Sequence, residues 1–402
     1  MQLLLFADTT GAVRRRLPLL AVPLLGLLLA TAASAAPDKR ISWAQPQIAR
    51  VVRAGFMAQS VASFRATDAL TEAELEQIVA GIDERLTPPP APEPPPDPAF
   101  TDPSTTDPTV TDSTVTDAEP PPPPPEPQPP WPLVHWKATS PAGTVSVTVF
   151  DRVLVSALGL ADAARHIRSV LLAAGLHPAG RVGTETVARL IGLRLNHPAA
   201  DDDLELLPDQ PVTRAEAAYS LDRALAFDAG THDWVEQAAA AFAVPVLDDW
   251  QRRVLTKAVS YVGYPYVWGG TSPGPESPFG VEAVGGFDCS GFVWRVYKLS
   301  VYGGERSLAS VLRGRTTFEM SGEVGPRDRI YEPRNLKPGD VLFFGHGRDS
   351  KPSEVDHAGI YLGDGWMVQS SGNGVTITPF DGWYTQSFAW ARRPLREAGL
   401  DR

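Results

Sequence analysis

Apolar residues at helical spacing occur in two stretches of the chain, residues 41–86 and 133–230, although the apolar face at the start of the first stretch is irregular. This spacing predicts amphipathic helices, and the first stretch is expected to hold two of them. In the second helix of that pair, Thr71 stands where an N-cap is expected, and Glu74 three residues later completes a capping box. The N-terminal half is therefore expected to be mostly α-helical.

The pattern changes from residue 247 to the C-terminus, where short apolar runs alternate with glycine-containing turns. One helix is predicted over residues 249–262, because its apolar positions repeat with helical spacing. Strands are predicted at residues 341–344, 357–362, 366–371, 375–378 and 388–391. Helices followed by a sheet of antiparallel strands predict an α+β fold.

Between the two helical stretches, residues 87–132 hold 20 of the 40 prolines and eight acidic residues, but no lysine or arginine. Such a segment cannot bury enough apolar surface to offset the entropy of ordering, so we predict a disordered, extended linker. It supplies 8 of the 11 net negative charges, whereas residues 247–402 balance 18 acidic against 18 basic side chains. Because no domain is basic, a nucleic-acid partner is not expected.

The N-terminus has the features of an export signal. Arginines at positions 14–16 precede an apolar run over residues 17–30, which is short for a membrane span, and Ala35 ends a small-residue cleavage motif. We therefore predict a cleaved signal peptide and a protein that works at the cell envelope or outside the cell; an uncleaved membrane anchor is the alternative. The predicted parts of the chain are residues 1–35, 36–86, 87–132, 133–230 and 240–402.

The helical stretches contain a weak internal repeat. Its three copies, each expected to open a helix, lie at residues 71–74, 148–151 and 213–216. In the second copy the helix is expected to begin at Val153. The third copy resembles S-layer homology repeats, and this resemblance implies a module that binds an anionic cell-wall polymer, here through Arg214. The alternative is a scaffold of ordinary capped helices.

Cys289 is the single cysteine of the chain, which excludes a disulfide within one chain and a zinc site built on several cysteines. Glycines precede it and apolar residues at helical spacing follow it, so we expect it in the first turn of a helix with Asp288 as N-cap. Unpaired N–H groups and the positive end of the helix favour a thiolate there, and could also hold an oxyanion. Cys289 is therefore the candidate nucleophile; a buried structural cysteine is the alternative.

A cysteine nucleophile needs a base. His346 lies in a polar segment that is expected to be a solvated loop, whereas His357 opens a predicted strand, so His357 is the candidate base. Gln369, on the next strand, is the candidate to orient the imidazole. A three-residue loop over residues 363–365 would pair Gly359 with Gln369 and place Gln369 on the same face as His357, whereas a two-residue turn would place it on the opposite face. We predict the three-residue loop.

Five motifs of the C-terminal part, taken together and in this order, resemble those of NlpC-family cell-wall peptidases. They lie at residues 266–270, 287–292, 315–316, 336–340 and 357–363. The resemblance implies a papain-like fold, with Cys289 as nucleophile, His357 as base and the Tyr266 hydroxyl close to the reacting carbon. It also implies Asp288 and Ser290 as candidate substrate contacts.

Two features depart from the family pattern. Gln369 stands where the family most often has histidine, although a glutamine oxygen can still accept the imidazole N–H. The segment over residues 271–285 is longer than usual and is expected to narrow the cleft or restrict access.

The resemblance implies an enzyme that hydrolyses peptidoglycan stem peptides without a metal or organic cofactor, typically at the bond between the γ-carboxyl of D-glutamate and a diamino acid. The expected partners are stem peptides and, through the helical repeats, a cell-wall polymer. Two alternatives remain: a catalytically silent wall-binding protein, and a cysteine amidase that acts on the link between glycan and peptide.

Overall fold

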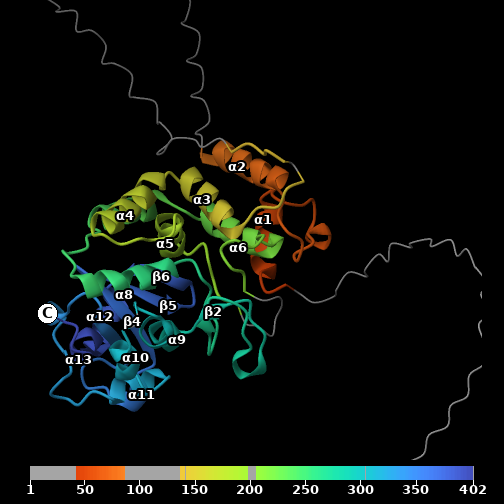
Figure 1. Ribbon diagram of the computed structural model, residues 1–402. Helices are drawn as coiled ribbons and strands as arrows, with labels where there is room; N and C mark the ends of the chain where they lie inside the picture. The colour runs from red at the N-terminus through yellow and green to blue at the C-terminus, as the bar shows by residue number, and fades with distance from the viewer. Residues whose placement is uncertain (1–41, 87–135, 141, 198–204, 304, 402) are drawn as a thin grey trace, which may run out of the picture. The chain divides into compact units, whose positions relative to one another are not determined.

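The computed structural model describes residues 42–86, 136–140, 142–197, 205–303 and 305–401 (Figure 1). The predicted signal peptide and the predicted proline-rich linker therefore lie outside the described residues. Among the described helices, none is both long enough and apolar enough to cross a membrane.

Helices dominate the N-terminal half, as predicted. They are α1 (Gln45–Arg53), α2 (Glu72–Leu86), α3 (Val147–Ala157), α4 (Ala161–Ala173), α5 (Val182–Leu190), α6 (Arg214–Leu225) and α7 (Ala229–Ala240). The two helices expected in residues 41–86 are α1 and α2. The helical region was expected to end at residue 230, but it continues through α7, which packs against α4.

The first and third copies of the internal repeat open helices as predicted. The Thr71 hydroxyl accepts from the Glu74 backbone at 3.2 Å, and the Thr213 hydroxyl accepts in the same way from Glu216. The expectation for the second copy was wrong: α3 begins six residues before Val153, because Ser146 is its N-cap. The register of the repeat was therefore misplaced in this copy.

Three short extended segments, one before each of α2, α3 and α6, hold the repeat together. The backbone N–H of Leu70 donates to Val212 at 2.8 Å, that of Val212 donates to Val145 at 2.8 Å, and that of Val145 donates to Leu70 at 3.0 Å. All three side chains are buried in the core. This closed ring of hydrogen bonds gives the internal repeat a structural basis; its likeness to S-layer repeats stays a prediction.

The C-terminal part has the predicted α+β fold (Figure 1). Its helices are α8 (Asp249–Ser260), α9 (Cys289–Trp294), α10 (Ser307–Val311), α11 (Thr317–Gly322), α12 (Gly382–Ser387) and α13 (Pro394–Glu397). Its strands are β1 (Thr271–Ser272), β2 (Gly286–Phe287), β3 (Val341–Phe344), β4 (His357–Gly363), β5 (Trp366–Ser371), β6 (Gly374–Pro379) and β7 (Phe388–Arg392). The last five strands form one antiparallel sheet in the order β6-β5-β4-β3-β7, and each overlaps a predicted strand.

Alternation along the strands gives the sheet two buried faces. Val341, Phe343 and Ile360 belong to the large core that also contains the apolar sides of α8 and α9. Leu342 and Phe344 belong to a smaller cluster on the opposite face, where Tyr384 of α12 packs. Helix α9 also packs against β4, which brings its first residue close to the start of that strand.

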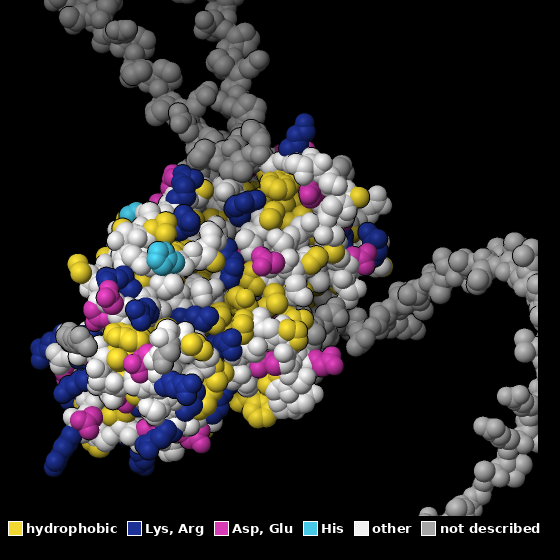
Figure 2. Space-filling model, viewed as in Figure 1, with side chains coloured by type: hydrophobic (Ala, Val, Ile, Leu, Met, Phe, Trp, Pro, Cys, Tyr) yellow, Lys and Arg dark blue, Asp and Glu magenta, His cyan; other side chains and the backbone are white. Residues whose placement is uncertain are grey.

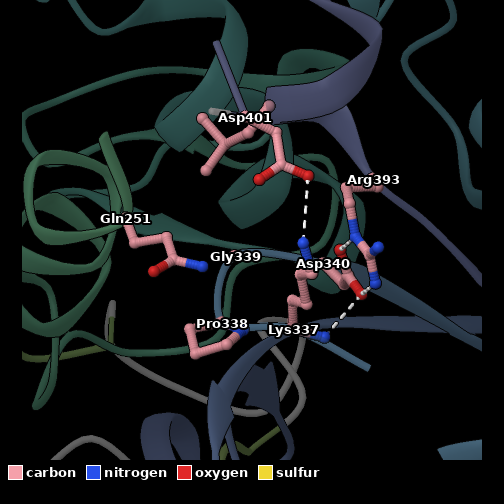
Figure 3. A pocket seen from close by; sticks show the side chains of 8 residues that line it. Gln251, Lys337, Pro338, Gly339, Asp340, Arg393 and Asp401 are labelled. Atoms are coloured by element: carbon pink, nitrogen blue, oxygen red, sulfur yellow. Dashed lines mark hydrogen bonds and ion pairs between the residues drawn. The ribbon is translucent and has the colours of Figure 1, made fainter. Parts of the chain in front are cut away.

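The turn before β3 is anchored by a buried carboxylate, as Figure 3 shows. Asp340 accepts from the Arg393 guanidinium at 2.8 and 2.9 Å and from the backbone N–H of Lys337 at 2.8 Å. Burial raises the pKa of Asp340, and Arg393 opposes that shift. Because β3 pairs with β4, this turn helps to fix the strand that carries His357.

The helical region contacts the C-terminal part through α5 and the residues next to it. Arg181 donates to the Val262 carbonyl at 2.9 Å, and Arg189 donates to the Gly263 carbonyl at 2.8 Å. Both carbonyls lie a few residues before Tyr266. The described residues therefore form one compact unit, in which helices of the N-terminal half support the segment that leads to Tyr266.

Candidate active site

Cys289 is the first residue of α9, as predicted. Asp288 is its N-cap, and its carboxylate accepts from the backbone N–H of Gly291 at 2.5 Å. Cys289 is 8% exposed, and its Sγ lies 3.9 Å from the carbonyl oxygen of Asp356, the residue before His357. The backbone of Ala358, the residue after His357, also acts on the thiol. Cys289 and His357 are therefore neighbours.

The expected thiolate is not the resting state of this site. Burial, together with the Asp288 carboxylate, raises the pKa of Cys289 to about 12, and the N–H groups that favour the thiolate only offset this in part. Burial likewise lowers the pKa of His357 to about 4. At neutral pH both groups are uncharged, so the thiol has a neutral imidazole beside it that can accept its proton.

Gln369 lies on the same face of the sheet as His357, because Gly359 pairs with Gln369 as predicted. The loop that produces this register is different from the predicted one. Strand β4 continues to Gly363, which pairs with Trp366 across a two-residue turn, and a bulge between Tyr361 and Gly363 restores the register. The bulge therefore supplies the extra residue that the three-residue loop was expected to supply, and Gly359 stays opposite Gln369.

Two buried polar atoms of this cluster have no hydrogen-bond partner in the described structure, His357 Nε2 and Gln369 Oε1. His357 Nε2 can carry a proton, whereas Gln369 Oε1 can only accept a hydrogen bond. Gln369 also favours the protonated form of His357. The Gln369 amide nitrogen is already engaged by the Tyr384 hydroxyl at 3.0 Å. This arrangement suits an Nε2–H that donates to Gln369 and leaves Nδ1 for the thiol.

Arg315 is the residue whose importance sequence reasoning missed, although its position in the family motifs pointed to it. Its guanidinium donates to Ser290 Oγ at 2.6 Å, to Asp288 Oδ2 at 3.0 Å and to the carbonyl oxygens of Gly269 and Gly270 at 3.1 and 3.2 Å. Asp288 and Ser290 are thus held in one network beside Cys289. Any substrate contact of these two residues depends on Arg315.

Tyr266 is half-buried. Burial, and to a smaller extent the electrostatic influence of Cys289 and Asp288, raises the pKa of its hydroxyl well above the usual range. The hydroxyl is therefore a neutral donor near the thiol. Residues 271–285, expected to narrow the cleft or restrict access, lie in a small hairpin in which β1 pairs with β2. Its tip carries Phe279, which is 81% exposed and packs against Gly269.

Two other residues singled out from the sequence lie apart from this cluster. His346 is exposed on the loop after β3, as expected. Arg214 is 2% exposed; it pairs with Glu74 and donates to the carbonyls of Phe64 and Met57. This corrects the expected polymer-binding role, because the guanidinium is buried and hydrogen-bonded within the protein, where it joins α6 to α2.

One cluster of metal-ligating side chains occurs among the described residues. His197, Glu205 and Glu216 have ligand atoms within 4.8 Å of one another. Arg194 pairs with Glu216 at 3.3 Å, and the His197 ring stacks on Trp43 at 4.5 Å. These ion-pair and ring contacts account for the cluster as part of the buried packing of the helical region.

With this geometry established, comparison with known proteins is decisive for the C-terminal part. The family model described as NlpC/P60 family matches residues 263–393. These residues are an NlpC/P60 domain. The match begins at Gly263, whose carbonyl accepts from Arg189, and contains every member of the cluster around Cys289.

Known relatives match this NlpC/P60 domain only over part of their length. The murein DD-endopeptidase MepH of Escherichia coli is 32% identical over 146 residues, 35% of this chain and 45% of MepH. The gamma-D-glutamyl-L-lysine dipeptidyl-peptidase of Bacillus cereus is 30% identical over 154 residues, 38% of this chain and 37% of that enzyme. A crystal structure of an NlpC/P60 family protein from Bacillus cereus is 26% identical in sequence, with a TM-score of 0.27. The match covers 39% of this chain and 43% of the chain in that structure. The chain spans less than half the length of these curated relatives.

Proposed function

We propose that the protein is an exported cysteine endopeptidase that cleaves the stem peptides of peptidoglycan at the cell envelope. The observation that carries the proposal is the meeting of Cys289 with the backbone on both sides of His357, with Gln369 on the same sheet face. An intact thiol, base and orienting group suit acyl transfer. The names of the relatives support peptidoglycan as the substrate class.

The chemistry follows from the charges of the resting site. As Cys289 Sγ attacks the amide carbonyl, its proton passes to neutral His357, and the Nε2–H of the imidazolium is stabilised by Gln369 Oε1. The Tyr266 hydroxyl and the N–H groups at the start of α9 stabilise the oxyanion. His357 then gives its proton to the departing amine, and water, deprotonated by His357, hydrolyses the thioester and releases the peptide acid.

The bond that we propose is the amide between the γ-carboxyl of D-glutamate and the diamino acid. The name of the relative from Bacillus cereus supports this bond, whereas the name of MepH points to a D,D bond. Both bonds are amides next to a D-residue, so the same nucleophile and base serve either. The choice between the two bonds therefore depends on which peptide the surface around Asp288 and Ser290 binds.

The test is digestion of purified peptidoglycan with the full chain and with Cys289→Ala, followed by mass spectrometry of the released fragments. Stem peptides cut after D-glutamate, absent with Cys289→Ala, would support the proposal in full. Cleavage between two D-residues would keep the enzyme class and change the bond, and release of intact stem peptides would indicate the amidase. No release by the full chain, together with retention on the insoluble wall, would overturn the proposal in favour of a silent wall-binding protein.

A further inference from the structure

A basic groove lies outside the active site, at the junction of the helical region and the NlpC/P60 domain. Its volume is about 810 Å³. One wall is the exposed side of α8, another is the segment around His177 after α4, and the third is formed by residues 301–303. In Figure 2, dark-blue Lys and Arg side chains lie over and around the position of α8. Ligand sites often occupy such junctions between two parts of a fold.

The groove is positively charged although the chain carries a net charge of −11. Arg252, Arg253 and Lys257 line it together with His177, and Asp249 is the single acidic residue among the lining residues. Arg252 pairs with Asp249. Within the described part of the chain, no carboxylate lies within ion-pair distance of Arg253 or Lys257, so at least two cations face the groove uncompensated.

Packing holds these two cations in place. The Arg253 guanidinium lies over the Trp250 ring at 4.8 Å, and the Lys257 ammonium lies over the Tyr261 ring at 5.0 Å. They are four residues apart on α8, so they share one side of the helix. The opposite side of α8, with Leu255 and Val259, is completely buried. The helix therefore presents a fixed basic edge to the groove.

We propose that this groove binds a polyanion, a polymer that carries phosphate or carboxylate groups at intervals. One exposed ion pair contributes little, so a small anion would be held weakly here. A polymer can engage several cations at once, because after the first contact each further contact is intramolecular. The site is distinct from buried Arg214, and the inference stands whether or not the proposed endopeptidase activity is found.

The test measures binding of the full chain to inorganic polyphosphate and to poly-γ-glutamate, with neutral dextran as a blank, by fluorescence anisotropy at low and high salt. The variant is Arg253→Glu with Lys257→Glu, and the matched control is Arg327→Glu with Arg334→Glu, two exposed arginines outside the groove with the same change in net charge. Circular dichroism checks that both variants fold. Hydrolysis of a soluble stem peptide is followed in parallel.

We expect the unmodified chain to bind polymer in a salt-sensitive way. The groove variant should lower the affinity roughly tenfold or more, because its new carboxylates repel the polyanion, and the control variant should stay within about twofold of the unmodified chain. The tighter of the two polymers identifies phosphate or carboxylate as the ligand group. Equal losses in both variants would overturn the proposal, since general surface charge would then explain the binding, and so would absence of binding by the unmodified chain. Peptide hydrolysis without polymer binding would reject the groove alone, and binding without hydrolysis would reject the proposed function alone.

Discussion

The side-chain nitrogen of Gln369 donates to the hydroxyl of Tyr384 at 3.0 Å, and this contact decides which end of the amide is left for His357. The same nitrogen also approaches Ser371 Oγ at 3.3 Å. With the nitrogen engaged twice, Oε1 remains as the acceptor for the imidazole. Tyr384 comes from α12, outside the strands that carry His357 and Gln369, so the orientation of the Gln369 amide toward His357 depends on a helix beyond the sheet.

Replacing Tyr384 by Phe should lower kcat about 3- to 10-fold with little change in KM, because one hydrogen bond that orients Gln369 is lost while the ring packing stays. The acid limb of the pH–rate profile should also move, since the amide can now turn away from His357. Tyr331→Phe, a ring outside this cluster, is the matched control. An unchanged kcat and pH profile in Tyr384→Phe would show that Gln369 holds its orientation without the hydroxyl.

Substitutions at Gln369 should separate orientation from packing. Gln369→Ala removes the acceptor and is expected to cost roughly tenfold or more in kcat, whereas Gln369→His should retain most of the activity. Gln369→Glu places a carboxylate beside the imidazole and should raise the pKa of His357 above its value of about 4. The acid limb of kcat/KM should then shift to higher pH; equal activity in all three variants would rule out an orienting role for residue 369.

The pKa values of the resting pair predict slow chemical labelling. With the pKa of Cys289 raised to about 12, the thiol is protonated at pH 7 and should react with iodoacetamide more slowly than free cysteine, with a rate that climbs steadily toward alkaline pH. Because the pKa of His357 is lowered to about 4, kcat/KM should rise through about pH 4 to a plateau. Rapid labelling at pH 6 would instead indicate a thiolate–imidazolium pair. Denatured protein gives the reference rate.

The site was predictable from the sequence where local rules set the geometry. Asp288 before a helix with glycines upstream places Cys289 at the helix start, and strand alternation places His357 and Gln369 on one face. The turn between their strands was not predictable in detail, because a bulge and a longer loop give the same register. The resting charge of Cys289 was also missed, since burial is a property of the packed fold and here outweighs the helix end.

Long-range contacts were beyond prediction for the same reason. The hydrogen bonds of Arg315 to Asp288 and Ser290 span more than twenty residues, and the role of Tyr384 depends on where α12 packs. Arg214 shows the converse: a motif position suggested an exposed binding group, whereas Glu74, 140 residues away, pairs with it. Sequence spacing constrains neighbours along an element but not partners brought in from another one.

Arg315→Ala should destabilise the domain as well as lower its activity. The Asp288 side chain is 12% exposed, and loss of the guanidinium leaves it with backbone and hydroxyl donors alone. We expect the free energy of unfolding to fall by about 2–4 kcal/mol in urea titrations, with Arg315→Lys intermediate because an ammonium cannot replace the fork. In a protein that already carries Asp288→Asn, Arg315→Ala should lower the free energy of unfolding by much less. If the losses of the two single variants add up fully in the double variant, the two side chains are not coupled.

The junction between the helical region and the NlpC/P60 domain should be tested at Arg189. This side chain pairs with fully buried Glu185 and donates to the Gly263 carbonyl, so Arg189→Ala leaves both an unpaired carboxylate and an unpaired carbonyl. We expect a loss of about 3–5 kcal/mol in the free energy of unfolding.

The effect should reach the active site, because Gly263 lies three residues before Tyr266. We expect kcat to fall in the remaining folded enzyme more than KM rises, since Tyr266, whose hydroxyl we propose to stabilise the oxyanion, is no longer held. Arg165→Ala, which removes an exposed pair with Asp162 on α4, is the control and should change stability by less than about 1 kcal/mol. A destabilised Arg189→Ala with unaltered kcat would mean that the helices support the domain without positioning Tyr266.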